Sequence, residues 1–292
     1  MTTPSAVSPK FGPADDVLAA LPTVYRDDLF ANKVVLVSGA GSGIGKAIAF
    51  LFARLGATLA ICGRKAEALA DCADKLRALS GREVYCHPMT IREPEQVDRL
   101  FGAVWERFGR LDVLVNNAGG QFGAPAMDIS ARGWNAVIDL NLNGSWYMMQ
   151  AAAKRWVKHG SAGNIVNIAF AIDRGLPGVA HSLASRAGVI ALSRTLAVEW
   201  AEHGIRLNCI GVGSVESTGF NNYREENIAA FSAGNPMRRV GDVQDVAEAV
   251  VYLAAPSGKF VTGEVVNVDG GQTLWGELWP AGKPDYFKVD VE

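Results

Sequence analysis

A group of glycines near the N-terminus has the residue types and the spacing of a phosphate-binding site. The chain reads Val-Ser-Gly-Ala-Gly-Ser-Gly-Ile-Gly, which places Gly39, Gly43 and Gly45, with Ser42 and Ile44, between an apolar run and a helical pattern. Glycine permits positive φ and a close approach of the backbone to an anion, and the first amides of a helix can bind a pyrophosphate. A second strand ends about 20 residues later, so the pattern predicts a dinucleotide site rather than only a tight turn.

The end of the second apolar run distinguishes between the two nicotinamide dinucleotides. An acidic residue here would bond the ribose 2′-hydroxyl of NAD, whereas an arginine accommodates the 2′-phosphate of NADP. In this chain Gly63 leaves room, and Arg64 supplies a guanidinium that matches phosphate geometry. The alternative interpretation is an exposed arginine at a helix start. We therefore expect NADP(H) as the cofactor.

Alternating strands and helices must position these residues. After residue 30, short β-branched runs alternate with helical patterns, which is typical of a parallel sheet with crossover helices. The runs are apolar without alternation, as expected of strands covered on both faces. The expected strands are Val34–Val37, Thr58–Cys62, Glu83–His87, Val113–Asn116, Asn164–Ile168, Ile205–Ile210 and Glu264–Val268. The expected helices are Ile44–Leu55, Ala66–Leu79, Pro94–Phe108, Trp134–Lys158, His181–His203 and Val243–Leu253. Together they predict an α/β fold, a single doubly wound Rossmann domain with a seven-stranded parallel sheet and helices on both faces.

The segments outside these elements carry separate expectations. Residues 1–30 are rich in Pro, Thr, Ser and Asp and predict an irregular N-terminal leader, so that the single NAD(P)-binding domain spans residues 31–292. Residues 211–236 have no clear regular pattern, and because such long loops are commonly functional we expect a substrate loop there. The C-terminal tail 271–292 holds aromatic residues that we expect to pack on the domain or on another subunit. They are Trp275, Trp279, Tyr286 and Phe287.

Composition and charge exclude several classes of function. The 292 residues are 49% hydrophobic and 20% charged, with a net charge of −2. The charges are spread along the chain without a basic stripe, which argues against a nucleic-acid partner. No apolar stretch approaches the roughly 20 residues of a membrane helix, and no secretory signal is evident, so we expect a cytoplasmic location without a membrane partner. The four cysteines lack metal-ligand spacing, and we expect free thiols and no metal site.

Four motifs make the chain resemble the short-chain dehydrogenase/reductase superfamily from about Lys33 to Gly271. In chain order they are Gly-x3-Gly-x-Gly, Asn-Asn-Ala-Gly, Gly-Asn-Ile-Val-Asn-Ile and Val-Asp-Gly-Gly. The resemblance implies the strand order 3-2-1-4-5-6-7 and a homotetramer built on two long helices. It also implies cofactor contacts on the adenosine-ribose side, at the adenine and at the nicotinamide carboxamide. These contacts would come, respectively, from Asn117, Ala118 and Gly119, from Ile91, and from the turn that holds Gly213 and Val215.

The chain departs from this family at the positions that carry its chemistry. Members that oxidise alcohols have a serine after the fifth strand and then Tyr-x-x-x-Lys at the start of the next long helix. Here that strand ends at Phe170 without the serine, and the Tyr and Lys positions hold Ser182 and Arg186, while Asn141 is retained. The chain resembles the branch of enoyl-CoA and 2,4-dienoyl-CoA reductases. Dienoyl-CoA reductases of this branch have the same serine and an amide near Gln121.

The replacement of tyrosine by serine favours reduction of a C=C bond over reduction of a carbonyl. Carbonyl reduction needs a proton on oxygen, and a serine hydroxyl is a poor acid near neutral pH. When hydride goes to carbon in a conjugated thioester, charge develops on the thioester oxygen, where a hydrogen-bond donor stabilises it. Ser182 could be that donor. Arg186 would contact the nicotinamide ribose, and because arginine keeps its proton it cannot shuttle one.

Each of these four residues also has a structural interpretation. Ser182 could cap the helix that starts there, and Asn141 could hold a bulge and a water in its helix rather than take part in the chemistry. Arg186 could form a surface ion pair. Gln121 could be an ordinary loop residue.

Three functions therefore fit the sequence. The first hypothesis is NADPH-dependent reduction of the C=C bond of an α,β-unsaturated acyl-CoA-like thioester, a small-molecule partner. The second is a carbonyl reductase or hydroxyacyl-CoA dehydrogenase whose acid is displaced to Tyr147 or His181. The third is a non-catalytic, cofactor-binding subunit of a related enzyme. The intact glycine turn and Arg64 argue against it, because a purely structural subunit needs no cofactor selectivity.

Overall fold

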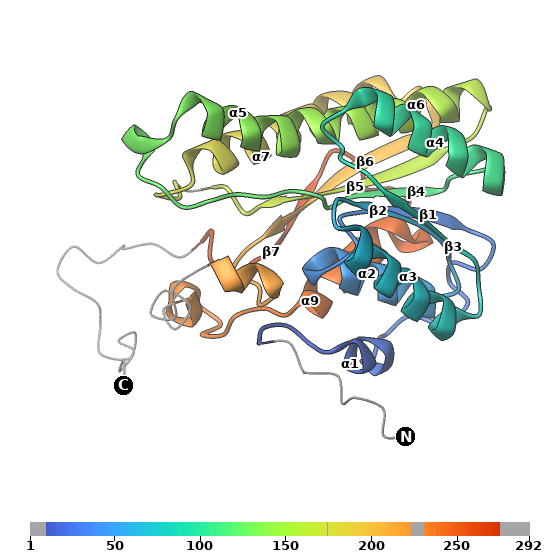
Figure 1. Cartoon of the computed structure of the whole chain (residues 1–292), viewed down its shortest axis with the longest axis horizontal. Coiled ribbons are helices and arrows are strands. Elements are labelled where there is room, and N and C mark those ends of the chain that lie inside the picture. The colour runs from blue at the N-terminus through green and yellow to red at the C-terminus, as the bar shows by residue number, and fades with distance from the viewer. Residues whose placement is uncertain (1–9, 174, 223–230, 275–292) are drawn as a thin grey trace.

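The computed structural model describes residues 10–173, 175–222 and 231–274. Its centre is a sheet of seven strands in the order β3-β2-β1-β4-β5-β6-β7 (Figure 1). Every neighbouring pair of strands is parallel. The strands are β1 (Val34–Ser38), β2 (Thr58–Gly63), β3 (Val84–Pro88), β4 (Val113–Asn116), β5 (Gly163–Phe170), β6 (Ile205–Val212) and β7 (Val265–Val268). The predicted α/β Rossmann fold and the predicted strand order are confirmed.

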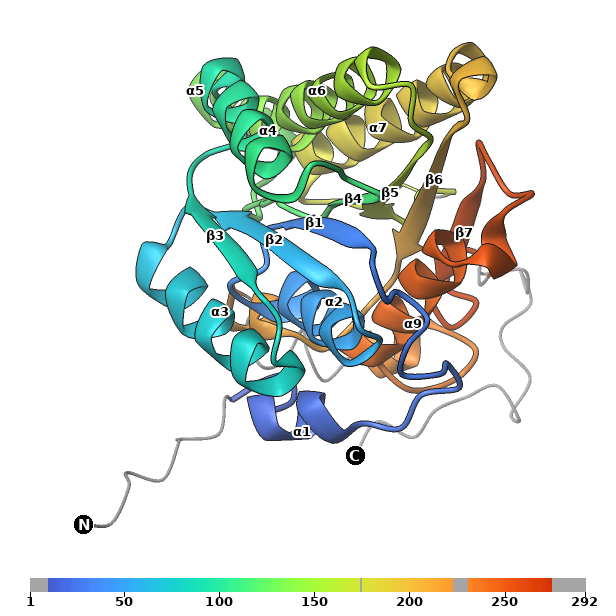
Figure 2. The ribbon, with the colours of Figure 1, turned by 90° about the vertical axis from the view of Figure 1, so that its right-hand side faces the viewer.

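Helices cover both faces of the sheet, as Figure 2 shows. One face carries α4 (Pro94–Phe108), α5 (Ala131–Ile138), α6 (Gly144–Lys158) and α7 (Ala180–Glu199). The other face carries α1 (Asp15–Ala20), α2 (Gly43–Arg54), α3 (Ala66–Ser80) and α9 (Val243–Ala254). The chain changes faces between β3 and β4, so the order of strands reverses at β1 and β4. Ligands of such sheets bind at this switch point, beyond the carboxyl ends of the strands.

The central strand β1 explains why the apolar runs did not alternate. All five of its residues are buried. Val35 and Val37 belong to the apolar cluster under α2 and α9, whereas Val34 and Leu36 belong to the cluster under α4 and α6. Successive strand residues point to opposite faces, and here both faces are covered, so both sets of side chains are apolar.

Two predicted helices differ from the structure by more than one residue at an end. The helix expected at Trp134–Lys158 begins earlier, where Ser130 accepts a hydrogen bond from the Gly133 amide at 3.1 Å. It is also interrupted between α5 and α6 by a π-helical segment, Asp139–Asn143. The helix expected at His181–His203 is α7 followed by a 3₁₀ turn, Ala201–His203, which ends at Gly204 with φ of 69°.

The expectations for the outer segments need similar correction. The leader is not wholly irregular, because residues 15–20 form α1 against α2. Residues 211 and 212 of the expected substrate loop complete β6, and the described part of the rest contains short 3₁₀ turns and an isolated bridge at Val215. The tail aromatics Trp275, Trp279, Tyr286 and Phe287 lie outside the described residues. None of the helices in the described ranges has the length and hydropathy of a membrane span.

Candidate functional site

The glycine turn after β1 leaves its backbone open to a ligand. Gly39 and Gly43 have φ of 70° and 55°, which glycine adopts without strain. A Cβ atom on Gly45 would overlap the Asn117 amide and the Gly39 carbonyl. Helix α2 begins at Gly43, and the Ser42 side chain before it makes no capping hydrogen bond. The first amides of α2 are therefore available to an anion.

Ser38, which the sequence analysis did not single out, joins this turn to the end of β4. Its hydroxyl accepts hydrogen bonds from the backbone amides of Asn117 and Ala118, both at 3.0 Å. The Asn117 side chain in turn donates to the carbonyls of Ser38 and Gly39 at 3.0 and 3.3 Å. The two loops that meet at the switch point are thus held at a fixed separation. In the sequence, the signal for this role was that Ser38, a small hydroxyl residue, directly precedes the first glycine of the turn.

A cleft of about 420 Å³ runs along this edge of the sheet. Most residues predicted to bind the cofactor line it. They are Gly39, Ser42, Gly43, Ile44, Gly45, Arg64, Ile91, Asn117, Ala118 and Gly119. Further residues that the sequence analysis missed also line it, among them Lys65, Met89, Leu140, Ser217 and Thr218. The two hydroxyl residues follow β6, and their position beyond a strand end was the signal for them.

Gly213 and Val215 do not line this cleft, since Gly213 lies next to β7 and Val215 next to Gly241. The Gly213 amide donates to the Val268 carbonyl at 3.0 Å, and a Cβ on Gly213 would approach Asp269 Cα to 2.6 Å. Val215 is buried and forms a bridge with Gly241. The structure therefore gives both residues a structural role in shaping the turn after β6, and their contact with a nicotinamide carboxamide stays a prediction.

Arg186 is a buried cation in the middle of the site. One of its guanidinium nitrogens donates to the Ile168 carbonyl at the end of β5, and the guanidinium carbon lies 5.6 Å from the centre of the Phe170 ring. Its Nε atom has no hydrogen-bond partner among the described residues. Burial lowers the pKa of Arg186 to about 10. The surface ion pair considered for Arg186 is wrong, because the side chain is buried.

Asn141 lies in the π-helical segment, and both polar atoms of its side-chain amide form hydrogen bonds. Its Oδ1 atom accepts from the Gly120 amide at 2.9 Å, and its Nδ2 atom donates to the Gly120 carbonyl at 3.0 Å and to Ser185 Oγ at 3.1 Å. Asn141 therefore holds the loop after β4 against α7. This geometry favours the interpretation that Asn141 maintains the helix bulge.

Ser182 is not the cap of its helix. Helix α7 begins at Ala180 with Val179 as the capping residue, so Ser182 lies inside the first turn. Its hydroxyl is buried and has no partner among the described residues. A buried hydroxyl without a partner costs free energy, and a ligand that accepts its hydrogen bond would remove that cost.

The neighbouring side chains close this end of the site. His181 Nδ1 accepts a hydrogen bond from the Ser182 amide at 2.8 Å, and its Nε2 atom has no hydrogen-bond partner within the described part of the chain. Its ring lies 4.4 Å from that of Phe122, edge to face. Gln121, in the same loop as Phe122, is half-buried. Tyr147, on α6, packs against the apolar cluster on that face of the sheet.

Comparison with known proteins gives the family. The family model described as enoyl-(acyl carrier protein) reductase matches residues 39–273. The chain belongs to the short-chain dehydrogenase/reductase family. The crystal structure of a short-chain dehydrogenase from Bacillus anthracis has a TM-score of 0.77 and 36% identity, covering 85% of this chain and 99% of that one.

Two curated relatives of this short-chain dehydrogenase/reductase differ in the reaction for which they are named. A probable 2,4-dienoyl-CoA reductase of Bacillus subtilis is 37% identical over 248 residues, 83% of this chain and 97% of the relative. A glucose 1-dehydrogenase of Gluconobacter oxydans is 36% identical over 266 residues, 88% of this chain and 98% of the relative. The predicted family is confirmed, and the protein is an oxidoreductase that uses a nicotinamide cofactor. Its substrate has to be argued from the site.

Proposed function

We propose that this protein uses NADPH to reduce the C=C bond of an α,β-unsaturated acyl-CoA-like thioester. The observation that carries the proposal is the Ser182 hydroxyl, which is buried and has no partner among the residues that the structure describes. It stands at the position where carbonyl-reducing members of the family have tyrosine. That hydroxyl can donate a hydrogen bond but is a poor acid. The relatives named as 2,4-dienoyl-CoA reductases support the same class of substrate.

The choice of NADPH is supported by two basic residues at the end of β2. Arg64 and Lys65 are exposed and line the cleft. Gly63 before them has no side chain that could bond a ribose 2′-hydroxyl. A guanidinium matches phosphate geometry with paired donors, so Arg64 fits the 2′-phosphate of NADP(H).

The roles of the residues follow from this assignment. The bound cofactor would supply a hydride to the β-carbon, which leaves negative charge on the thioester oxygen. Ser182 would donate a hydrogen bond to that oxygen. Arg186 holds a positive charge close by, because its lowered pKa of about 10 still lies above neutral pH. The proton taken up by the α-carbon comes from a group other than Arg186, since arginine keeps its proton.

A panel of substrates with the purified protein tests the proposal. Oxidation of NADPH is followed with 2-enoyl-CoA and 2,4-dienoyl-CoA thioesters, and with acetoacetyl-CoA and simple ketones. We expect turnover with the unsaturated thioesters and none with the ketones. Turnover only with ketones or alcohols would favour the alternative of a carbonyl reductase. No turnover with any substrate, despite bound NADPH, would favour the non-catalytic subunit.

A variant connects the activity to Ser182. Ser182→Ala should lower kcat/KM for the unsaturated thioester by about 100-fold, the usual effect of removing one donor to a developing oxyanion. Thr195→Ala, on the exposed side of the same helix, is the control and should keep wild-type kcat/KM. Equal kcat/KM in the two variants would exclude Ser182 from the chemistry.

A further inference from the structure

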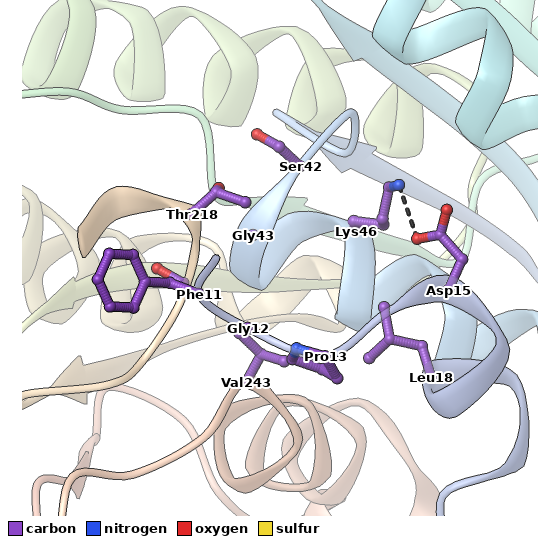
Figure 3. Close-up of a pocket in the computed structure, with 11 residues that line it drawn as sticks. Phe11, Gly12, Pro13, Asp15, Leu18, Ser42, Gly43, Lys46, Thr218 and Val243 are labelled. Carbon is purple, nitrogen blue, oxygen red and sulfur yellow. Dashed lines mark hydrogen bonds and ion pairs between the residues drawn. The ribbon is translucent and has the colours of Figure 1, made fainter. Parts of the chain in front are cut away.

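The N-terminal segment of residues 10–20 crosses the back of the glycine turn, outside the residues that match the family model. We call these residues the N-terminal strap. The strap, the start of α2 and the turn after β6 together enclose a small cavity (Figure 3). Ser42, Gly43, Ser217 and Thr218 line both this cavity and the cofactor cleft. The strap is therefore one layer of residues away from the cleft.

On one side, the strap is attached to the turn after β6. The Gly12 amide donates to Glu216 Oε1 at 3.0 Å. The rings of Phe11 and the buried Phe220 meet edge to face at 5.8 Å. Gly12 has φ of 80°, and a Cβ there would lie 3.5 Å from Ser217 Cα, so the two backbones pack directly on each other.

On the other side, the strap is anchored to the helices beneath the glycine turn. Asp15 accepts a hydrogen bond from Lys46 Nζ at 2.8 Å, which Figure 3 shows, and another from Lys75. The Leu18 side chain is 4% exposed and belongs to the apolar cluster under α2. Lys46 follows the last glycine of the turn, yet its ammonium group is directed to Asp15.

Between these two attachments, the strap holds the turn after β6 against the glycine turn. Thr218 Oγ1 lies 3.1 Å from the place of a Cβ on Gly43, at the first residue of α2. A shift of Ser217 and Thr218 would therefore change the space in front of the free amides of α2. These amides are where we place the pyrophosphate.

We propose that the N-terminal strap is a positioning element of the dinucleotide site. It fixes Ser217 and Thr218 at the pyrophosphate end of the cleft through Glu216 and Phe220, and it sets the affinity for the cofactor at that end. The adenosine end, with Arg64, is independent of it. This inference rests on the proposed binding of NADPH.

Dissociation constants of two ligands test the inference. NADPH has a pyrophosphate, whereas 2′-AMP has only the adenosine and the 2′-phosphate. The full-length double variant Phe11→Ala/Glu216→Ala should bind NADPH about tenfold more weakly, because one hydrogen bond and one ring contact are lost. Its affinity for 2′-AMP should stay at the wild-type value. The single variant Glu216→Gln keeps Phe11 and retains an acceptor oxygen for the Gly12 amide. It should therefore bind NADPH as tightly as the wild type.

The controls separate this inference from the proposed function. Val24→Ala, at a residue that is 90% exposed just after the strap, should leave both constants unchanged. Wild-type affinity for NADPH in the double variant would overturn the role of the strap and leave the proposed function standing. If the double variant binds NADPH and 2′-AMP more weakly by the same factor and has a lower Tm, the role of the strap is also overturned. The substitutions would then have destabilised the domain as a whole. A wild-type protein that binds no dinucleotide would overturn both proposals.

Discussion

The buried Arg186 side chain requires a glycine at position 119, on the loop that packs against it. A Cβ on Gly119 would overlap the Arg186 guanidinium. That guanidinium is held between Ile168 and Phe170, with no carboxylate partner among the ion pairs of the described residues. A fixed, weakly hydrated cation suits such a site, because arginine stays charged where a buried lysine loses its proton.

The variant Arg186→Lys should therefore have a steeper pH dependence than the wild type. The pKa of Arg186, lowered by burial to about 10, keeps the wild-type residue charged through the neutral range. Burial of a lysine at this place would lower its pKa further, so that its positive charge is lost as the pH rises. We expect kcat/KM of the variant to fall more steeply with rising pH than that of the wild type. A pH profile of both enzymes is the measurement, and parallel profiles would contradict this account.

Arg64 is the residue on which the prediction of NADP(H) rather than NAD(H) depends. Arg64→Glu should raise the dissociation constant of NADPH by about tenfold to a hundredfold, because a hydrogen bond to a charged group contributes roughly 1.5–3 kcal/mol. The constant for NADH should change much less. Arg82→Glu reverses the charge of an exposed arginine near the other end of the sheet and is the control. Equal changes for NADPH and NADH would mean that Arg64 does not bind the 2′-phosphate.

At the scale of elements, the strands could be predicted and the break between α5 and α6 could not. Strands such as β1 are buried on both faces, so their sequence carries the information locally. The π-helical segment instead depends on Asn141 bonding Gly120 and Ser185, which lie 21 and 44 positions away in the chain. The attachment of the strap could not be predicted for the same reason, because Gly12 and Glu216 are 204 positions apart. Local pattern cannot reveal such contacts.

The π-helical segment should depend for its stability on the Asn141 amide. Asn141→Ala removes three hydrogen bonds and leaves the half-buried amide and carbonyl of Gly120 without this partner, while Ser185 keeps its bond to the Ser182 carbonyl. We therefore expect a loss of about 2–3 kcal/mol in the free energy of unfolding. Asn143→Ala, in the same segment, removes only an exposed bond to Asp139 and should cost less than about 0.5 kcal/mol. Urea denaturation measures both. Similar losses in the two variants would show that Asn141 has no special part in holding the segment.

At the scale of the whole molecule, two groups of exposed apolar side chains are unexplained by the single chain. Val157 and Val198, near the ends of α6 and α7, are 47% and 81% exposed. Tyr252, on α9, and Phe260, in the segment between α9 and β7, are 40% and 100% exposed. The two groups lie on different sides of the sheet. A homotetramer with two kinds of interface would cover both of them, since symmetric oligomers pair identical patches.

The expected tetramer makes a prediction about mass in solution. The wild-type protein should have four times the 31.0 kDa of one chain by light scattering. Val198→Glu and Phe260→Glu each place a charge in one interface, where burial without a partner is costly, so each variant should form dimers of twice the chain mass. Their combination should give the single chain. Arg82→Glu, at an exposed residue just before β3 on the sheet edge opposite β7, should remain tetrameric. A wild-type mass equal to one chain would mean that both apolar groups face solvent, and the tetramer would then be wrong.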